Sequence, residues 1–245
     1  MNKYNTGYYQ CSNCLFIQTD EPHWLRESYS SAITALDIGL VQRNIQFSNI
    51  TVAIINLFFK KDEKFIDFGG GYGMFVRMMR DKGFDFYRQD MYCENLFAKN
   101  FDVTDLPQPV KFELLTAFEV FEHLPDPLQT IDELLKYSDN ILFSTTLQPI
   151  PKPTPETWWY ILPEIGQHIS LFHLKTLEYI AQKKNLFLFS NGKNTHLLTK
   201  KKINPLLFKL ITKERVAKLI NPVFINGNKS LTEKDLDYLK MKSSI

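Results

Sequence analysis

The sequence predicts an α/β fold built on a mostly parallel sheet. Between about residues 64 and 200, short apolar runs typical of strands alternate with amphipathic stretches typical of helices, which is the pattern of βαβ units. The chain has 245 residues, of which 44% are hydrophobic and 23% charged. It can therefore bury a large core, and disordered, collagen-like and low-complexity classes are excluded. One domain with an appendage is the expected size class, because single cores grow to roughly 250 residues.

The expected elements follow one another along this region. Strands are predicted at residues 65–68, 84–87, 113–117, 141–145 and 186–189, and helices at 74–82, 128–137 and 175–184. Gly83 is placed to end the first of these helices, because glycine readily adopts the left-handed conformation found after a helix C-terminus. Leu147 to Pro163 contains five prolines, which neither a strand nor a helix interior tolerates, so a loop is predicted there.

Two flanking segments complete the predicted organisation. Residues 1–61 are expected to hold a Cys-x-x-Cys segment and a helical cap, since Pro22 suits a first helical turn and residues 45–58 carry an apolar stripe. Residues 62–202 form the central domain. Residues 203–245 are expected to form a basic helical extension of two short amphipathic helices, separated by a turn at Asn226-Gly227-Asn228.

Charge is unevenly distributed along the chain. The net charge is +2, yet residues 200–245 hold 11 Lys and Arg against 4 Asp and Glu, which is +7 and leaves −5 for the rest. Such a tail could contact nucleic acid, an anionic membrane surface or an acidic partner, although a solvated helical face is the favoured interpretation. No stretch reaches the ~18–20 apolar residues of a membrane span. With three cysteines and no apolar signal core at the N-terminus, a cytoplasmic protein is expected.

A glycine loop is the most informative local pattern. The apolar run 65–68 leads directly into Gly69, Gly71 and Gly73 and then into a predicted helix. Glycine is needed where the backbone has positive φ, or where a ligand approaches the main chain without an obstructing Cβ. A dinucleotide fingerprint would require glycine or alanine at Met74, so a nicotinamide cofactor is disfavoured. A phosphate-binding P-loop is excluded because no Gly-Lys-Ser/Thr follows.

This segment resembles the first motif of the class I S-adenosylmethionine-dependent methyltransferases, an acidic residue followed by G-x-G-x-G. The similarity covers roughly residues 60–200. It implies a Rossmann-like sheet of seven mostly parallel strands with helices on both faces, S-adenosyl-L-methionine as methyl donor, and residues 62–202 as the domain that binds it. Asp90 is expected to hold the ribose hydroxyls and Asp102 to contact the adenine amino group. The residues expected to bind the cofactor are Asp67, Gly69, Gly70, Gly71, Gly73, Asp90, Asp102 and Phe118.

Two further segments resemble branches of this family. Residues 119–127 look like the "EVLEH-pDP" segment of small-molecule methyltransferases, including those acting on sugars and on ubiquinone precursors, although Glu113 stands where aspartate is usual. Residues 158–160 and 166–172 resemble a segment near the acceptor pocket of one branch. The aromatic residues at 158–160 would form either a sugar-stacking platform or ordinary packing, and the sequence leaves both open. Asp126 is expected to cap the helix that follows it.

His168 and His123 are the candidate catalytic residues. A hydroxyl acceptor must lose a proton as it gains a methyl group, and imidazole titrates near pH 6.5, so either histidine could act as general base. A structural role is an equal alternative for each, and His168 is preferred because it follows the proline-rich loop. Glu119, Glu122 and His123 also resemble a divalent-metal site of ubiquinone-pathway relatives, but no metal is predicted.

The cysteine pair is interpreted as structural. Cys11 and Cys14 have the spacing of a zinc knuckle, and some sugar C-methyltransferases carry two such pairs at the N-terminus. The second pair is missing from this chain, and a closed four-ligand zinc site cannot be written without it. A degenerate remnant or a pair of buried thiols is therefore favoured over metal binding.

The leading functional hypothesis is a methyltransferase acting on a small molecule such as a sugar or sugar nucleotide. An RNA methyltransferase is the alternative, encouraged only by the basic tail. It is disfavoured as a class because the Asn/Asp-Pro-Pro-Tyr motif of base-amino methylation is absent after residue 117. A third hypothesis is a non-catalytic module that binds the cofactor and serves as an interaction partner. The sequence does not indicate the oligomeric state.

Overall fold

The computed structural model describes residues 4–28, 37–225 and 228–243. Two compact units make up the chain, each assembled from two segments. Met1–Asp37 and Ala117–Lys202 form the first unit, and Ile38–Thr116 and Ile203–Ile245 form the second. Part of the predicted helical cap, residues 29–36, and residues 226–227 of the predicted turn lie outside the described residues. The domain boundaries predicted from the sequence stay predictions.

The predicted Rossmann-like α/β class is confirmed, but the sheet differs from the expected one. Six strands form a mixed sheet, in the order β4-β3-β5-β6-β9-β8, where seven mostly parallel strands were predicted. Five of these strands coincide closely with the predicted ones, and β9 was missed. The strands are β3 (Lys64–Phe68), β4 (Asp85–Gln89), β5 (Leu114–Ala117), β6 (Asn140–Ser144), β8 (Phe187–Ser190) and β9 (Thr195–Thr199).

Both departures have local causes. β8 and β9 are joined by only residues 191–194 and pair antiparallel, because a parallel connection needs a crossover of about a dozen residues or more. At the other edge, the strand expected beyond β4 is reduced to an isolated parallel bridge between Arg88 and Asp102. Asp102 immediately begins the 3-10 helix η1 (Val103–Asp105) with a capping box, so the backbone turns away from the sheet.

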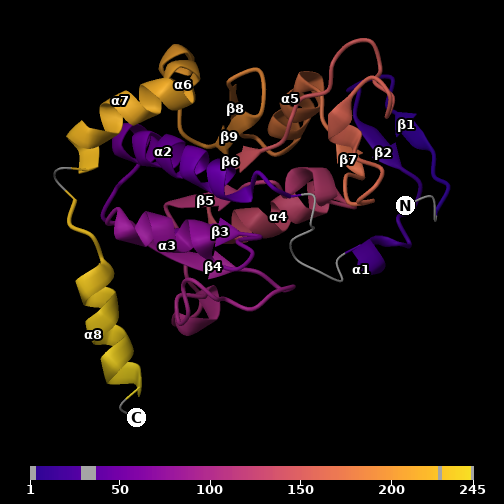
Figure 1. Cartoon of the computed structure of the whole chain (residues 1–245). Helices are drawn as coiled ribbons and strands as arrows, with labels where there is room; N and C mark the ends of the chain where they lie inside the picture. Colours follow the sequence, from indigo (N-terminus) through magenta and orange to yellow (C-terminus); the bar gives the residue numbers. More distant parts are fainter. Residues whose placement is uncertain (1–3, 29–36, 226–227, 244–245) are drawn as a thin grey trace. The chain divides into compact units, whose positions relative to one another are not determined.

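In the second unit, β3 pairs in parallel with β4 and β5. The helices of this unit are α2 (Leu40–Phe58), α3 (Met74–Asp81), α6 (Pro205–Ile211), α7 (Glu214–Ile225) and α8 (Thr232–Ser243). α2 packs against α3, α6 and α7 (Figure 1). Aromatic side chains fill the core at the sheet, where Phe65 stacks on Phe86 and meets Phe84 edge-on. α8 is held to α3 by a buried ion pair between Arg80 and Asp235.

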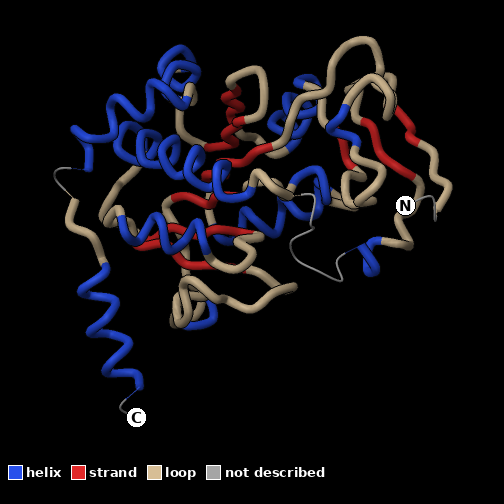
Figure 2. Tube along the Cα trace, viewed as in Figure 1, coloured by secondary structure: helices blue, strands red, loops and turns tan. Residues whose placement is uncertain are grey.

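The first unit holds a second, three-stranded antiparallel sheet of order β1-β2-β7. The strands of this sheet are β1 (Tyr8–Gln10), β2 (Ile17–Thr19) and β7 (Ser170–Leu171). The helices of the first unit are α1 (Leu25–Ser28), η2 (Phe121–His123), α4 (Pro127–Tyr137), η3 (Trp159–Ile161) and α5 (Leu174–Lys183). β1 and β2 lie in the Cys-x-x-Cys segment, before the predicted helical cap, and were not predicted. Figure 2 shows the proline-rich segment between β6 and β7 mostly as loop, as predicted. Asp126 caps α4 by accepting a hydrogen bond from the Gln129 N–H.

The structure offers no membrane span in the part of the chain that it describes. The longest helix there, α2, has 19 residues, and neither it nor any other described helix is both long and apolar enough to cross a bilayer.

Candidate functional site

The glycine loop connects β3 to α3 in the second unit. Gly69, Gly71 and Gly73 have φ of 68°, 53° and 84°, a region that residues with a Cβ enter only at a cost. Gly73 occupies the N-cap position of α3. A Cβ built on Gly71 would meet no atom within 4 Å. The main chain at Gly71 therefore faces open space in which a ligand can approach the backbone.

Asp90 lies directly after β4 and is bonded to this loop. Its Oδ2 accepts a hydrogen bond of 3.0 Å from the Gly71 N–H. Its Oδ1 accepts hydrogen bonds from the N–H groups of Tyr92 and Cys93, at 2.8 and 3.1 Å. The Cys93 thiol also donates to Oδ1, at 3.6 Å. Among these hydrogen bonds Oδ2 accepts only the one from Gly71, and a carboxylate oxygen has two lone pairs, so a further donor such as a hydroxyl can bond to Oδ2. Asp90 thus lies beside the glycine loop within the second unit, and its predicted contact with the ribose hydroxyls stays a prediction.

Asp102 is engaged in an ion pair. Its Oδ1 accepts a 2.6 Å hydrogen bond from Arg88 Nε, and its Oδ2 accepts one of 3.3 Å from the Asn95 side chain. Arg88 also donates through Nη1 to the carbonyl oxygens of Gly71 and Cys93. The predicted adenine contact of Asp102 stays a prediction, and the structure adds a positioning role, since Arg88 connects this carboxylate to the glycine loop.

The buried side chain of Asp67 packs against the glycine loop. Its Oδ1 accepts a 2.6 Å hydrogen bond from the Thr116 hydroxyl. Burial raises the pKa of Asp67 to about 7, against the lowering effect of the Thr116 hydroxyl. A Cβ on Gly70 would lie 2.8 Å from Asp67 Oδ2 and 2.9 Å from Arg88 Cγ. Glycine at position 70 therefore allows the loop to pack directly on these two side chains.

The remaining predicted site residues lie in the first unit. Phe118 and Glu119 follow β5, and Glu119 has a positive φ of 56°. The Glu119 conformation is held by Ser144, whose hydroxyl donates to Glu119 Oε1 and accepts from the Glu119 N–H, both at 2.7 Å. A residue other than glycine held at positive φ is a feature that functional sites often show. The strained position comes just before η2, which carries Glu122 and His123.

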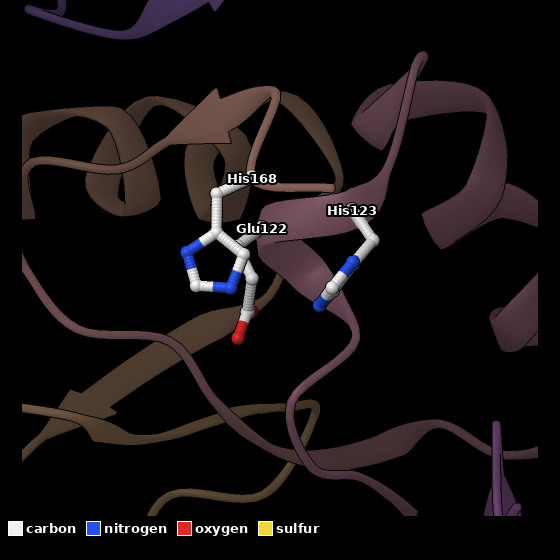
Figure 3. A group of neighbouring side chains, drawn as sticks. All are labelled: Glu122, His123 and His168. Carbon is white, nitrogen blue, oxygen red and sulfur yellow. The ribbon is translucent and has the colours of Figure 1, made fainter. Parts of the chain in front are cut away.

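Glu122, His123 and His168 form a cluster. One potential ligand atom from each lies within 4.8 Å of the others, and Figure 3 shows the Glu122 carboxylate beside the His168 ring, with the His123 ring facing both. The rings of His123 and His168 meet edge-on with centroids 5.1 Å apart. Backbone pairing brings the segments together, because the Ile169 N–H donates to the Glu122 carbonyl oxygen at 2.9 Å. The structure thus unites the two predicted catalytic histidines.

The two histidines differ in their surroundings. Burial and the neighbouring His168 lower the pKa of His123 to about 3, so His123 is neutral at physiological pH. His168 is 7% exposed, and its Nδ1 lies at hydrogen-bond distance from the Tyr160 carbonyl oxygen. A carbonyl can only accept, so Nδ1 carries a hydrogen, and in the neutral ring Nε2 is then the atom with the lone pair. His168 therefore presents Nε2 as its proton-accepting atom.

A family model described as a methyltransferase domain matches residues 41–190. The chain belongs to the methyltransferase domain family. This membership confirms the predicted class I S-adenosylmethionine-dependent methyltransferase, with S-adenosylmethionine as its methyl donor. A comparison with curated proteins found no match.

A comparison with solved structures found chains of similar fold. A chain in the complex of the Haloferax volcanii Trm112 methyltransferase activator with a methyltransferase has a TM-score of 0.50 at 12% identity, covering 72% of this methyltransferase and 98% of that chain. This likeness shows the shared fold alone. Also found were the plantazolicin methyltransferase BpumL in complex with a monoazolic desmethylPZN analog and SAH, and magnesium protoporphyrin IX methyltransferase (ChlM) from Synechocystis PCC 6803 with bound SAH. Their TM-scores are 0.48 and 0.46, their identities 12% and 13%, and they cover 73% and 72% of this chain and 93% of each of those chains.

The cluster of Glu122, His123 and His168 also has the chemistry of a metal site. One carboxylate and two imidazoles are ligands that divalent transition metals accept. Among the described residues, this is the one group of three or more potential ligand side chains close enough to share an ion. Cys11 and Cys14 lie in the turn between β1 and β2 as free thiols, Cys11 exposed and Cys14 half-buried.

The three aromatic residues of the proline-rich loop have separate roles in the methyltransferase. Trp158 and Tyr160 are 9% and 3% exposed and pack in a small core with Ile17 and Leu171. Trp159 is 70% exposed and lines an open surface hollow, whose lining residues are Pro155, Glu156, Trp159, Leu162, Pro163 and Glu164. Ordinary packing therefore accounts for two of the three rings, and only Trp159 is available for stacking.

Sequence reasoning missed the residues that hold the loop in place. Arg88 and Asn95 are buried and bond to the loop or to Asp102, but neither belongs to a motif. Arginine within an apolar strand was the available signal, because a buried guanidinium requires a partner.

Proposed function

We propose that this methyltransferase transfers the methyl group of S-adenosylmethionine to a small molecule, a sugar or sugar nucleotide. The observation that carries the donor half of the proposal is the hydrogen bond from the Gly71 N–H to Asp90. It holds a carboxylate beside a glycine loop whose main chain faces open space. A nucleoside ligand fits this arrangement, because its ribose hydroxyls can donate to the carboxylate while another part of the ligand lies against the main chain of the loop.

In this proposal the donor is held by the residues named from the sequence. Asp90 accepts hydrogen bonds from the ribose hydroxyls, and the positive-φ glycines let the donor approach the main chain. Asp67 and Arg88 position the loop from beneath, while Asp102 acts through its ion pair with Arg88. Phe118 supplies apolar contact. The residues present fit the ligand because no side chain fills the space beside Gly71.

The proposed chemistry is an in-line displacement. S-adenosylmethionine supplies an electrophilic methyl group on a positively charged sulfur, which needs little activation. An acceptor hydroxyl forms a bond to this methyl carbon as the carbon–sulfur bond breaks, and the acceptor proton passes to His168 Nε2. The contact of Nδ1 with the Tyr160 carbonyl fixes the tautomer in which Nε2 can take that proton. His123 contacts the His168 ring and, being neutral, adds no positive charge that would oppose protonation of His168.

A sugar-type acceptor is supported by the exposed ring of Trp159. Aromatic faces stack on the apolar faces of sugar rings, and carboxylates accept the hydrogen bonds of sugar hydroxyls. Trp159 shares its surface hollow with Glu156 and Glu164, so both kinds of contact are present there. The two carboxylates beside the ring support a carbohydrate more than a purely apolar acceptor.

The test is methyl transfer from radiolabelled S-adenosylmethionine to a panel of sugars and nucleotide sugars, with total RNA as the competing acceptor. We expect a sugar-containing compound to be labelled, and His168→Gln to abolish labelling while binding of S-adenosylhomocysteine is retained. His23→Gln, the same change at an exposed histidine, is the matched control. Labelling of RNA alone would refute the proposed acceptor class, and unchanged turnover in His168→Gln would refute the assigned base.

A further inference from the structure

We propose that helices α6 and α7 form a docking surface for an anionic lipid bilayer. Four aliphatic side chains are strongly exposed on these helices: Leu206, Leu210, Leu219 and Val223, at 78%, 47%, 78% and 76%. They occur as two i,i+4 pairs, so each pair lies along one face of its helix. Two successive short helices with paired exposed aliphatic side chains form a surface that water solvates poorly.

The opposite faces of both helices are anchored within the second unit. Phe208 and Ile211 of α6 and Ala217 of α7 are buried. α7 packs along α2, as does α6 over a shorter contact (Figure 1), and the Asn221 side chain donates a 3.0 Å hydrogen bond to the Asn49 carbonyl oxygen of α2. The exposed pairs therefore point away from α2, and a partner can reach both without disturbing the core.

Basic residues surround the aliphatic pairs. Residues 203–225 contain Lys209, Lys213, Arg215 and Lys218 against the single acidic residue Glu214, which gives +3. Lys209 lies between Leu206 and Leu210 in the sequence and is exposed, and Arg215 precedes Leu219 by one turn and is also exposed. Aliphatic side chains flanked by Lys and Arg are characteristic of helices that lie in a membrane interface.

The combination favours lipid over the other partners that a basic surface attracts. Nucleic acid would neutralise the charge through phosphate contacts, but its sequence-independent sites bind bases on aromatic rings and not on aliphatic side chains. A second copy of this chain would present the same +3 and be repelled. An anionic bilayer satisfies both features, since its headgroups attract the basic side chains and its acyl boundary accepts Leu and Val.

The lengths of the helices define the mode of binding. α6 has 7 residues and α7 has 12, whereas a span requires about 20. The helices would therefore lie on the bilayer surface and hold the methyltransferase there reversibly. Their attachment concerns a surface of the second unit and does not depend on the identity of the methyl acceptor.

Vesicle co-sedimentation of the full chain tests the proposal. One set of vesicles is pure phosphatidylcholine, and in the other about one third of the lipid is phosphatidylglycerol. We expect binding to the anionic vesicles only, weakening as salt is added because exposed charges are screened. Leu219→Glu combined with Val223→Glu should lower the affinity at least tenfold. Lys209→Glu or Arg215→Glu should each lower it about fivefold or more, given the contribution of one basic residue near such a surface.

Matched controls separate docking from general effects. Ile150→Glu removes an aliphatic side chain that is 74% exposed in the proline-rich loop, and Lys193→Glu reverses an exposed charge in the β8–β9 turn. Both should leave vesicle binding unchanged. Far-ultraviolet circular dichroism and S-adenosylhomocysteine binding verify that every variant is folded.

Several outcomes would overturn the proposal. The first is that the protein does not sediment with anionic vesicles. The second is that Ile150→Glu lowers the vesicle affinity as much as the changes in α7 do. The third is that vesicle binding does not change with salt concentration. A dimer in light scattering that Leu219→Glu dissociates would assign the surface to a second copy. Another result would assign the basic residues of α6 and α7 to nucleic-acid binding. In that case the protein does not bind vesicles, but it binds RNA in a filter assay, and Leu219→Glu does not weaken that binding.

Discussion

Asp90 Oδ2 accepts a 3.0 Å hydrogen bond from the backbone N–H of Gly71, nineteen residues before it. This bond joins the end of β4 to the loop that leaves β3, two strands that lie side by side in parallel. The carboxyl ends of adjacent parallel strands meet at one edge of a sheet, where α/β proteins bind their ligands. The donor site of this methyltransferase is proposed at that edge because the carboxylate and the open backbone occur there together.

Two neighbouring glycines should respond differently to alanine. Gly71→Ala adds a Cβ in open space but at φ of 53°, so we expect a stability cost of about 1 kcal/mol and a loss of S-adenosylmethionine affinity of more than tenfold. Gly70→Ala would place its Cβ 2.8 Å from Asp67 Oδ2, so we expect a larger loss of about 1–3 kcal/mol from overpacking. Thermal unfolding and calorimetry measure both quantities. Full donor binding by Gly71→Ala would show that the ligand does not approach this main chain.

Asp67 predicts a pH dependence of stability. Its folded pKa of about 7 exceeds the ordinary value of 3.8, so the folded state binds the proton more tightly than the unfolded state. The stabilisation is complete below about pH 4 and is lost as the pH rises toward 7. Asp67→Asn keeps an acceptor for Thr116 and has no such titration. We expect the variant to gain stability relative to wild type between pH 5 and pH 8, by about 3 kcal/mol, because about two pH units of the titration fall in this range. If the difference in stability between Asp67→Asn and wild type were the same at pH 5 and at pH 8, the burial assigned to this carboxyl would be contradicted.

His123 predicts the opposite slope in acid. Its folded pKa of about 3 lies below the ordinary 6.5, so protonation favours the unfolded chain, and the stabilisation present above pH 6.5 is lost as the pH falls toward 3. Between pH 7 and pH 5 this amounts to about 2 kcal/mol. In His123→Gln the loss should be absent from a urea-unfolding series across this range. Parallel curves for variant and wild type would argue against a buried neutral imidazole.

Alanine substitutions at the two adjacent tryptophans should affect different properties, protein stability at Trp158 and acceptor binding at Trp159. Trp158 is packed in a core and Trp159 is 70% exposed. Trp158→Ala is expected to cost about 3–5 kcal/mol through the cavity it leaves. Trp159→Ala should change stability by no more than about 0.5 kcal/mol, while raising the KM for a sugar acceptor and leaving donor affinity unchanged. A normal KM in Trp159→Ala would remove the stacking role.

The donor loop was predictable from sequence because its determinants are close in the chain. Gly69, Gly71 and Gly73 follow a strand directly, and Asp90 comes at the distance that a βαβ unit fixes. The ion pair between Arg88 and Asp102 was not predicted. The arginine within an apolar strand indicates that a buried guanidinium needs a partner, but the sequence does not indicate which carboxylate supplies it. His123 and His168 are 45 residues apart, and only the pairing of β7 with its neighbours brings them together.

β9 shows why one strand of the sheet was not predicted. Thr195, His196 and Thr199 alternate with or flank leucines, yet all are fully buried, so the strand lacks the apolar run that sequence patterns detect. His196 is satisfied by the Ser190 hydroxyl at 2.9 Å and the Thr145 carbonyl oxygen at 3.0 Å. The available signal was Asn191-Gly192, a dipeptide that favours a tight hairpin. It would have indicated the antiparallel pair that replaces the expected parallel connection.

The central claim is a donor site at Gly71 and Asp90, and calorimetric titration of the full chain tests it most directly. S-adenosylmethionine and S-adenosylhomocysteine are the ligands, NADH is the competing nucleotide, and Asp90→Ala is the variant. We predict micromolar binding of both sulfur compounds, no binding of NADH, and loss of binding in a folded Asp90→Ala. Unchanged affinity in Asp90→Ala, or no binding of either compound to folded wild type cleared of carried-over ligand, would contradict the account.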